Sequence, residues 1–319
     1  METIHCIFCN RLDEDPVVIE ENGYQGRKCP ICHLIYISPR PSLDEINKLY
    51  EEDQAFMPAD SHIADSYTKR LYARHHLAIL KKYAREGSLL EIGPGAGYFL
   101  DEGRKAGFQV NGIELNKRQA DFIRANMDIA CESVPLARAF PGIHFDILYH
   151  CDVASHFYDP IAEFKEMNQK LKEGGLLVFE TGSLGDVDEK YYSLYPDYQY
   201  PDHLFFYSEK NIRDLLHLTG FSLVEFRQYS ILPELLFMKW VHWIKSIRRH
   251  EARGKEPASR EMQAQIQPAG ASGESKAAQR GIANSLVHYL LRYQAGRWFP
   301  KKGRPSTYLY IARKRSSSE

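Results

Sequence analysis

Residues 91–99, EIGPGAGYF, carry the strongest indication of the fold. This stretch contains three glycines at alternating positions, Gly93, Gly95 and Gly97. The aliphatic run that leads into it, SLLEI, is typical of a buried β-strand, and residues 98–105 have a helical pattern that stops at Gly107. A strand, a glycine-rich turn and a helix in this order predict a unit that holds a ligand where its strand ends.

Strands and helices continue to alternate beyond this unit. Further strands are predicted in FQVNGIE (108–114), HFDILYH (144–150), GGLLVFE (174–180), FSLVEF (221–226) and STYLYIA (306–312). Helical segments follow Asn116, Asp159 and Ser208, three residue types that cap helix N-termini. The alternation predicts an α/β fold with a doubly wound, mainly parallel sheet, whose ligands lie at the carboxyl ends of the strands.

Two glutamates indicate which ligand the glycine turn holds. A nucleoside triphosphate would require Lys-Ser or Lys-Thr after the last glycine, but Tyr98 follows it. The pyrophosphate of a dinucleotide would be repelled by Glu91, whereas an ammonium group would be attracted. Glu114, at the end of the next strand, can accept hydrogen bonds from both hydroxyls of a ribose. A ribose joined to an amino-acid tail, as in S-adenosylmethionine, satisfies both carboxylates.

Four segments resemble the class I S-adenosylmethionine-dependent methyltransferase family: LLEIGPGAGYF (89–99), GIEL (112–115), FDILYHCDVASHFYDP (145–160) and LKEGGLLVFETG (171–182). The resemblance implies a seven-stranded, Rossmann-like sheet and S-adenosylmethionine as cofactor. It implies that the three glycines let the backbone approach the methionine tail, and that Glu91 holds the amino group of that tail. Glu114 would bind the ribose, and Cys151 and Asp152 would lie beside the cofactor. Ser155 departs from the pattern, because many relatives carry glutamate there.

Two C-x-x-C pairs near the N-terminus predict a zinc site whose ligands are Cys6, Cys9, Cys29 and Cys32. Four thiolates in two such turns satisfy tetrahedral zinc. Asn10 and His33 follow the two pairs, and both residue types are enriched at positive φ. The run that contains the second pair resembles the zinc ribbon ahead of many bacterial methyltransferases that act on sugars and other small molecules. A zinc ribbon also precedes some ribosomal RNA methyltransferases.

These motifs divide the chain into four parts. We expect a zinc-ribbon-like module at 1–40, a helical connector at 41–86, a cofactor-binding domain at 87–230 plus 305–314, and a helical insertion at 231–304 with a disordered linker at 251–281. The apolar segment 235–249 carries Trp240 and Trp243 among basic residues, which indicates either peripheral membrane contact or a buried or dimerising helix.

The overall charge favours no particular class of partner, because 41 basic residues balance 42 acidic ones. The N-terminus lacks the pattern of a signal peptide, so we expect a cytoplasmic location. An RNA-binding surface is not indicated by composition, although RNA methylation stays open.

Two histidines are the candidate catalytic residues. His156 follows the strand at 144–150, and His203 lies in YQYPDHLFFYS after the next strand. Histidine titrates in the range useful for deprotonating a methyl acceptor. We therefore expect methyl transfer to a hydroxyl or carbon of a sugar or other small metabolite, with a lipid-linked glycan included. The alternatives are an RNA methyltransferase and a catalytically silent protein that keeps the fold and the zinc.

Overall fold

The computed structural model describes residues 1–10, 14–253 and 282–316. Of the linker predicted at 251–281, residues 254–281 lie outside the described residues. Residues 251–253 form the end of helix α8 (Leu232–Arg253), so this helix extends three residues into the predicted linker.

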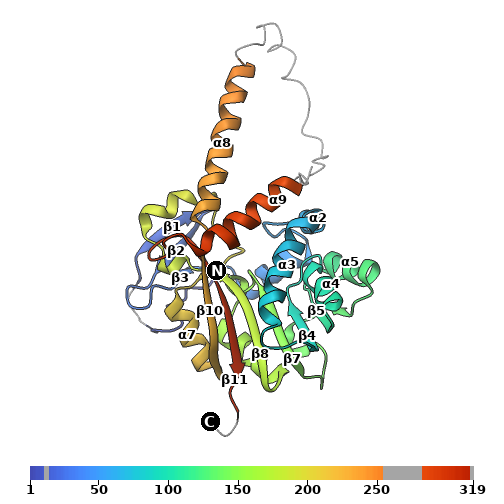
Figure 1. The fold of residues 1–319 in the computed structure, drawn as a ribbon. Coiled ribbons are helices and arrows are strands. Elements are labelled where there is room, and N and C mark those ends of the chain that lie inside the picture. The colour runs from blue at the N-terminus through green and yellow to red at the C-terminus, as the bar shows by residue number, and fades with distance from the viewer. Residues whose placement is uncertain (11–13, 254–281, 317–319) are drawn as a thin grey trace.

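A seven-stranded sheet forms the centre of the protein, with strand order β10-β11-β8-β7-β4-β5-β6 (Figure 1). The strands are β4 (Gly87–Ile92), β5 (Phe108–Ile113), β6 (Cys131–Glu132), β7 (Phe145–Cys151), β8 (Leu171–Gly182), β10 (Phe221–Ser230) and β11 (Ser306–Lys314). Strand β11 is antiparallel to both of its neighbours, and the other six strands share one direction. The predicted α/β class with a mainly parallel sheet is confirmed.

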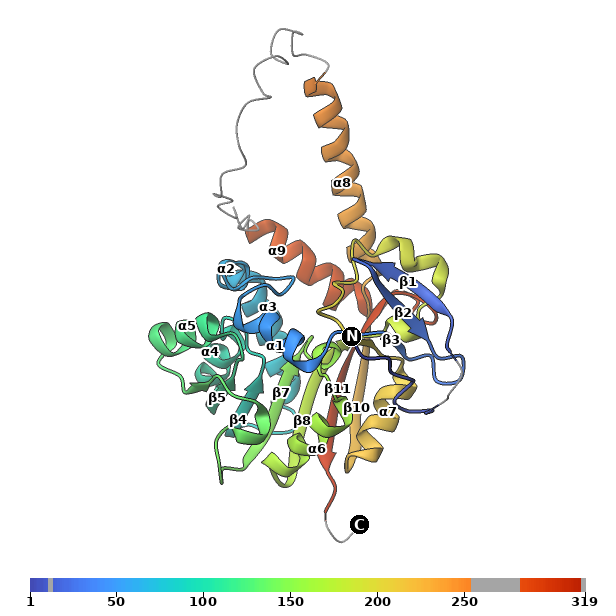
Figure 2. The ribbon, with the colours of Figure 1, turned by 180° about the vertical axis from the view of Figure 1, so that it is seen from behind.

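Helices cover both faces of this sheet. Helices α3 (Ser66–Leu80), α4 (Tyr98–Lys105) and α5 (Lys117–Met127) pack on one face, and α6 (Pro160–Lys170) and α7 (Glu209–Leu218) pack on the other (Figures 1 and 2). Side chains alternate between the two faces along each strand, so Leu89 and Ile147 join one core while Leu90 and Leu148 join the other. Because both faces are covered, the buried middle of β4 and of β7 consists mainly of apolar side chains.

Local signals place the helix N-termini at the carboxyl edge of the sheet. Gly97 has a left-handed φ of 77° and starts α4 directly after β4. The side chain of Asn116 accepts a hydrogen bond from the amide of Gln119 and so caps α5. Asp159 caps α6, which has Pro160 in its first turn, and Ser208 caps α7. The loops that precede these helices all gather at one edge.

The N-terminal module forms a second, four-stranded sheet. Its strands are β1 (Val17–Glu21), β2 (Tyr24–Lys28), β3 (Ile35–Ile37) and β9 (Phe205–Phe206), in that order. Strand β9 comes from the chain between β8 and α7, and its Phe206 pairs with Ile35. The cysteine module is thus joined to the rest of the protein by the hydrogen bonds between β3 and β9, with α7 beside it (Figure 2).

The start of the connector and the insertion lie above the carboxyl edge of the central sheet, whereas α3 packs on one face of it (Figures 1 and 2). The connector forms α1 (Leu43–Glu51), α2 (Ala59–Ala64) and α3. The insertion forms α8 and α9 (Ile282–Tyr289), and Ser285 of α9 hydrogen-bonds the buried Thr68 of α3 at 2.9 Å. Because the insertion leaves β10 and returns to β11 at the same edge, β11 must run antiparallel.

Short helical turns complete the connections. They are η1 (Leu136–Arg138), η2 (Ala154–His156), η3 (Leu184–Asp186), η4 (Glu189–Leu194), η5 (Leu290–Gln294) and η6 (Ala295–Arg297). Among the described helices, none is both long and apolar enough to cross a membrane.

Candidate active site

The glycine turn connects β4 to α4 and has the backbone conformation that requires glycine. The φ angles of Gly93, Gly95 and Gly97 are 66°, 56° and 77°. A Cβ at Gly95 would stand 2.9 Å from Nδ1 of His62, which belongs to α2. The connector therefore closes over the turn, and a side chain at this position would push it away.

Glu91 lies buried at the end of β4 with one carboxylate oxygen, Oε2, unpartnered among the described residues. Burial and then the nearby charge of Glu114 hold the pKa of Glu91 well above its ordinary value. A buried, unsatisfied carboxylate oxygen is costly. The ammonium group of S-adenosylmethionine is the kind of donor that would satisfy this oxygen.

Glu114 follows β5 and faces the same turn. Its Oε2 accepts a hydrogen bond from the amide of Gly95 at 2.9 Å, and its Oε1 accepts one from the amide of Asn116 at 3.0 Å. Burial raises the pKa of Glu114 to about 7, against the effect of these hydrogen bonds. A carboxylate has about four lone-pair positions, so acceptor capacity remains for the ribose hydroxyls.

Cys151 and Asp152 lie where β7 ends. Cys151 is half-buried, and Asp152 is exposed with a positive φ of 55°. Their side chains and that of Glu180 offer ligand atoms within 4.8 Å of one another. Glu180, however, already accepts hydrogen bonds from Tyr293 at 3.0 and 3.1 Å and pairs with His76 at 2.8 Å. Its carboxylate belongs to a polar network between β8, α3 and the insertion.

Four carboxylates thus stand at the carboxyl ends of neighbouring strands: Glu91, Glu114, Asp152 and Glu180. Burial raises the pKa of Glu91 and of Asp152, and the charge of Lys69 on α3 partly opposes this rise in both. S-adenosylmethionine carries a sulfonium and an ammonium against one carboxylate. An acidic edge of this kind complements such a cation.

His156 lies in η2, directly after β7. Its Nδ1 is 3.1 Å from both the side-chain Oδ1 and the backbone oxygen of Asp202, and 3.0 Å from the hydroxyl of Tyr50. Because both Asp202 atoms only accept hydrogen bonds, Nδ1 carries the proton. None of the described residues hydrogen-bonds Nε2, which is therefore the nitrogen left to act on a ligand.

The carboxylate of Asp202 tunes this histidine. Burial alone would lower the pKa of His156, but the hydrogen bond and charge of Asp202 raise it above the ordinary value. Burial raises the pKa of Glu114 and of Asp152, and the charge of His156 partly opposes this rise in both. The imidazole therefore lies within electrostatic reach of two expected cofactor residues.

His203 stands beside His156, with ring centroids 4.6 Å apart in an edge-to-face arrangement. Its Nδ1 donates to the backbone oxygen of Tyr198 at 3.1 Å. Burial and the charge of His156 lower the pKa of His203 to about 3, so it is neutral at pH 7. A neutral imidazole of such low basicity is suited to orienting a ligand rather than to removing its proton.

Sequence reasoning missed two partners of His156. The hydroxyl of Tyr50 donates to Asp202 Oδ1 at 2.6 Å, although the pattern of its segment predicts only an apolar helix face. Asp202 immediately precedes His203 in YPDHL, so an acid beside a candidate histidine was the one available signal. The longer segment 191–207, which includes Asp202, is rich in tyrosines, and its buried Tyr192, Tyr200 and Tyr207 belong to the core.

The four N-terminal cysteines converge in the ribbon. Their sulfur atoms lie within 4.8 Å of one another, and the sulfurs of Cys6 and Cys32 are 3.3 Å apart. Asn10 and His33 have the predicted positive φ, at 46° and 63°. The donor set and its spacing fit tetrahedral zinc.

Similarity to known proteins agrees with this fold. A family described as "Methyltransferase domain" matches residues 64–226. Among solved structures, the chain is similar to the 1,6-didemethyltoxoflavin-N1-methyltransferase of Burkholderia thailandensis, with TM-score 0.51 and 11% identity over 93% of this chain and 98% of that one. A putative sarcosine dimethylglycine methyltransferase from Galdieria sulphuraria gives TM-score 0.47 and 17% identity over 77% of this chain and 85% of that one. No curated protein sequence matches the chain.

The family match covers half of the chain and defines its class. The chain belongs to this family of methyltransferase domains. It is an S-adenosylmethionine-dependent methyltransferase with the class I fold.

Proposed function

We propose that the protein transfers the methyl group of S-adenosylmethionine to a hydroxyl or carbon of a sugar or other small metabolite, with His156 as general base. One observation carries the proposal. The Nδ1 of His156 is held by Asp202 at 3.1 Å while Nε2 stays available, at the strand edge where the cofactor carboxylates gather.

The cofactor supplies the electrophilic methyl group, and the protein positions and deprotonates the acceptor. His156 Nε2 takes the acceptor proton as the acceptor atom attacks, and Asp202 stabilises the imidazolium that results. Tyr50 donates to the same carboxylate oxygen and keeps it in place. His203 presents a neutral ring to the acceptor.

The cofactor is assigned to the residues of the strand edge. Glu91 would hold its ammonium group and Glu114 its ribose hydroxyls, while Gly93, Gly95 and Gly97 admit the methionine tail. Cys151 and Asp152 would lie beside it. The unpartnered oxygen of Glu91 supports this assignment.

We assign zinc to Cys6, Cys9, Cys29 and Cys32. The convergence of four sulfur atoms from two turns supports the assignment, because a buried thiol cluster of this kind is stabilised by a tetrahedral metal.

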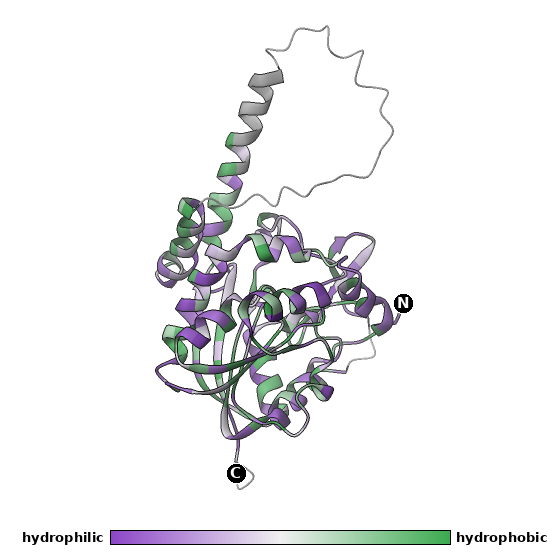
Figure 3. Ribbon diagram, turned by 90° about the vertical axis from the view of Figure 1, so that its right-hand side faces the viewer, coloured by the Kyte–Doolittle hydropathy of each residue, from purple (hydrophilic) through white to green (hydrophobic). Residues whose placement is uncertain are grey.

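The apolar segment 235–249 is a proposed contact with an anionic membrane surface. Leu236, Trp240 and Trp243 are exposed at helical spacing on α8, which projects from the body (Figure 3). Replacing both tryptophans by serine should abolish flotation with anionic liposomes. Unchanged flotation would contradict this contact.

Methyl-labelled S-adenosylmethionine tests the proposed reaction. Incubated with a cell extract, the protein should label the small-molecule fraction, and the variant His156→Ala should lower that labelling at least about a hundredfold. His144→Ala, at an exposed loop histidine, is the matched control. Labelling confined to RNA would overturn the small-molecule assignment, and full labelling by His156→Ala would overturn the role of the base.

A further inference from the structure

We propose that the N-terminal ribbon positions the catalytic pair, with Glu21 as the residue through which it acts. The catalytic consequence rests on the proposed role of His156. Glu21 ends strand β1 of the ribbon, whereas Asp202 lies in the loop between β8 and β9. The ribbon is therefore proposed to position Asp202 through its contacts with this loop.

The carboxylate of Glu21 accepts two backbone hydrogen bonds from the loop that carries Asp202. Oε1 accepts from the amide of Tyr198 and Oε2 from the amide of Tyr200, both at 2.8 Å. The neighbouring Asn22 donates its side-chain amide to the backbone oxygen of Tyr200, also at 2.8 Å. Hydrogen bonds to a charged acceptor are roughly twice as strong as neutral ones. The loop is thus clipped to the turn of the ribbon hairpin.

Side-chain packing reinforces the clip. The ring of Tyr200 lies against Gly26 of β2, where a Cβ would stand 2.1 Å from the tyrosine hydroxyl. Only glycine leaves room for this approach. Tyr200 itself is 3% exposed, so the ring is enclosed between ribbon and loop.

The ribbon holds the far end of the same loop as well. The amide of Ile37 donates to the backbone oxygen of Leu204 at 3.1 Å, and β3 pairs with β9 immediately afterwards. The amide of Leu204 donates to the backbone oxygen of Ser155, next to His156, at 2.8 Å. Three residues, Pro201 to His203, separate the two anchored positions. Their short span leaves Asp202 little freedom.

The segment that carries His156 is tied to the same module. The guanidinium of Arg40, which follows β3, donates to the backbone oxygen of Tyr158 at 2.7 Å and stacks on its ring at 3.6 Å. Both members of the pair therefore sit on loops that the ribbon anchors. Loosening one anchor should change the distance between Asp202 and His156 without touching the cofactor residues.

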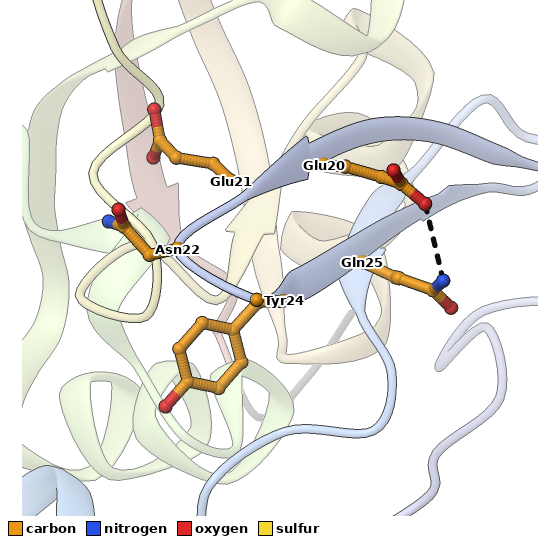
Figure 4. Close-up of a pocket in the computed structure, with 6 residues that line it drawn as sticks. Glu20, Glu21, Asn22, Tyr24 and Gln25 are labelled. Atoms are coloured by element: carbon orange, nitrogen blue, oxygen red, sulfur yellow. Dashed lines mark hydrogen bonds between the residues drawn. The ribbon is translucent and has the colours of Figure 1, made fainter.

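Glu20 provides a matched control, because it is a glutamate on the same strand with a different partner. Its Oε1 accepts from the side chain of Gln25 across the hairpin at 3.3 Å. Figure 4 shows this pair joined to each other, with Glu21 and Asn22 pointing elsewhere, in a surface hollow that residues 20–25 line. A change at Glu20 alters the charge of the hairpin equally and leaves the loop clip intact.

The test compares Glu21→Gln and Glu21→Ala with Glu20→Gln in the full chain. Amide hydrogen exchange at residues 198–206 should accelerate at least about tenfold in the Glu21 variants only, because a charge-assisted hydrogen bond is lost. The kcat should fall about tenfold with the KM for S-adenosylmethionine unchanged. The acidic limb of the kcat profile should move to lower pH as Asp202 separates from His156. Thermal unfolding verifies that each variant is folded.

Unchanged exchange at 198–206 in folded Glu21→Gln would overturn the inference, as would an unmoved pH profile. An equal effect of Glu20→Gln would also overturn it, because the clip would then not be specific. Failure of the proposed base is distinguishable. Full activity of the His156→Ala variant would contradict the role of His156 as base. The faster exchange at residues 198–206 in the Glu21 variants would not be affected by that result.

Discussion

Replacing Asp202 by asparagine tests the centre of the site, because it keeps the shape and removes the charge that faces His156. The lost contact is a charge-assisted hydrogen bond of 3.1 Å to an imidazole that is mostly buried. Such a bond contributes about 1.5–3 kcal/mol, which corresponds to a fall of about 10- to 150-fold in kcat. The KM for S-adenosylmethionine should stay within about twofold, since the described side-chain hydrogen bonds of Asp202 go to Tyr50, Phe56 and His156 and not to Glu91 or Glu114.

The pH dependence of kcat provides an independent test of the pairing between Asp202 and His156. The base must be neutral to act, so kcat rises with pH through the pKa of His156. Asp202 raises that pKa, because its carboxylate stabilises the imidazolium. Asp202→Asn should therefore move the acidic limb of the profile toward lower pH while lowering its plateau.

Single-turnover transfer from labelled S-adenosylmethionine, measured between pH 5 and 9, is the assay. Asp197→Asn, on the same loop and half-buried, is the control and should leave both limb and plateau unchanged. A plateau within about twofold of the unsubstituted enzyme, with an unmoved limb, would refute the pairing of Asp202 with the base.

Three further changes test the cofactor site, the ribbon and the core. In Glu91→Gln we expect the Kd for S-adenosylmethionine to rise about tenfold by calorimetry, while the cofactor-free protein melts at a higher temperature at pH 7. Burial raises the pKa of Glu91 in the folded state above its value in the unfolded chain. The neutral carboxyl therefore favours folding at pH values below the unfolded-state pKa. This contribution is lost as the pH rises toward and through the folded-state pKa. In Cys29→Ser the zinc content should fall below one per chain and the melting temperature by about 5 °C or more, and an unchanged metal content would contradict the zinc assignment. His150 is fully buried with both ring nitrogens unpartnered among the described residues, and burial lowers its pKa to about 3. Its unfolded pKa is near 6.5, so stability is lost as pH falls below that value, by about 2 kcal/mol at pH 5. His150→Phe should reduce this acid sensitivity in urea unfolding at pH 5 and 7, and an identical sensitivity would contradict the reasoning.

Much of the fold could be predicted because its signals are local. Strands β4 and β7 contain short apolar runs, and α4 spans 98–105 as its periodicity predicts. Asn116 caps α5 as expected. Local signals could not predict the direction of β11, because this direction depends on where the insertion leaves the sheet and where it returns to it.

The candidate site shows the same contrast between residues with local sequence signals and residues brought together only by folding. The glycine turn, Glu91 and Glu114 are recognisable because each stands at a strand end marked by its own neighbours. Tyr50 has no such mark, and a helical tyrosine is ordinarily assigned to an apolar face. It reaches Asp202 across 152 positions of sequence and His156 across 106, so only the packing of α1 above the sheet edge brings them together.

The sheet class, the methyltransferase resemblance and the spacing of the four cysteines could be recognised in the amino-acid sequence, because periodicity, helix caps and short ligand motifs act within a few residues. The pairing of β9 with the sheet of the ribbon and the hydrogen bonds from Glu21 to the loop of Asp202 depend on the folded arrangement of the whole chain. Those contacts join segments more than 150 residues apart. They form because backbone hydrogen bonds and buried side chains must be satisfied by whichever segment the folded core places beside them.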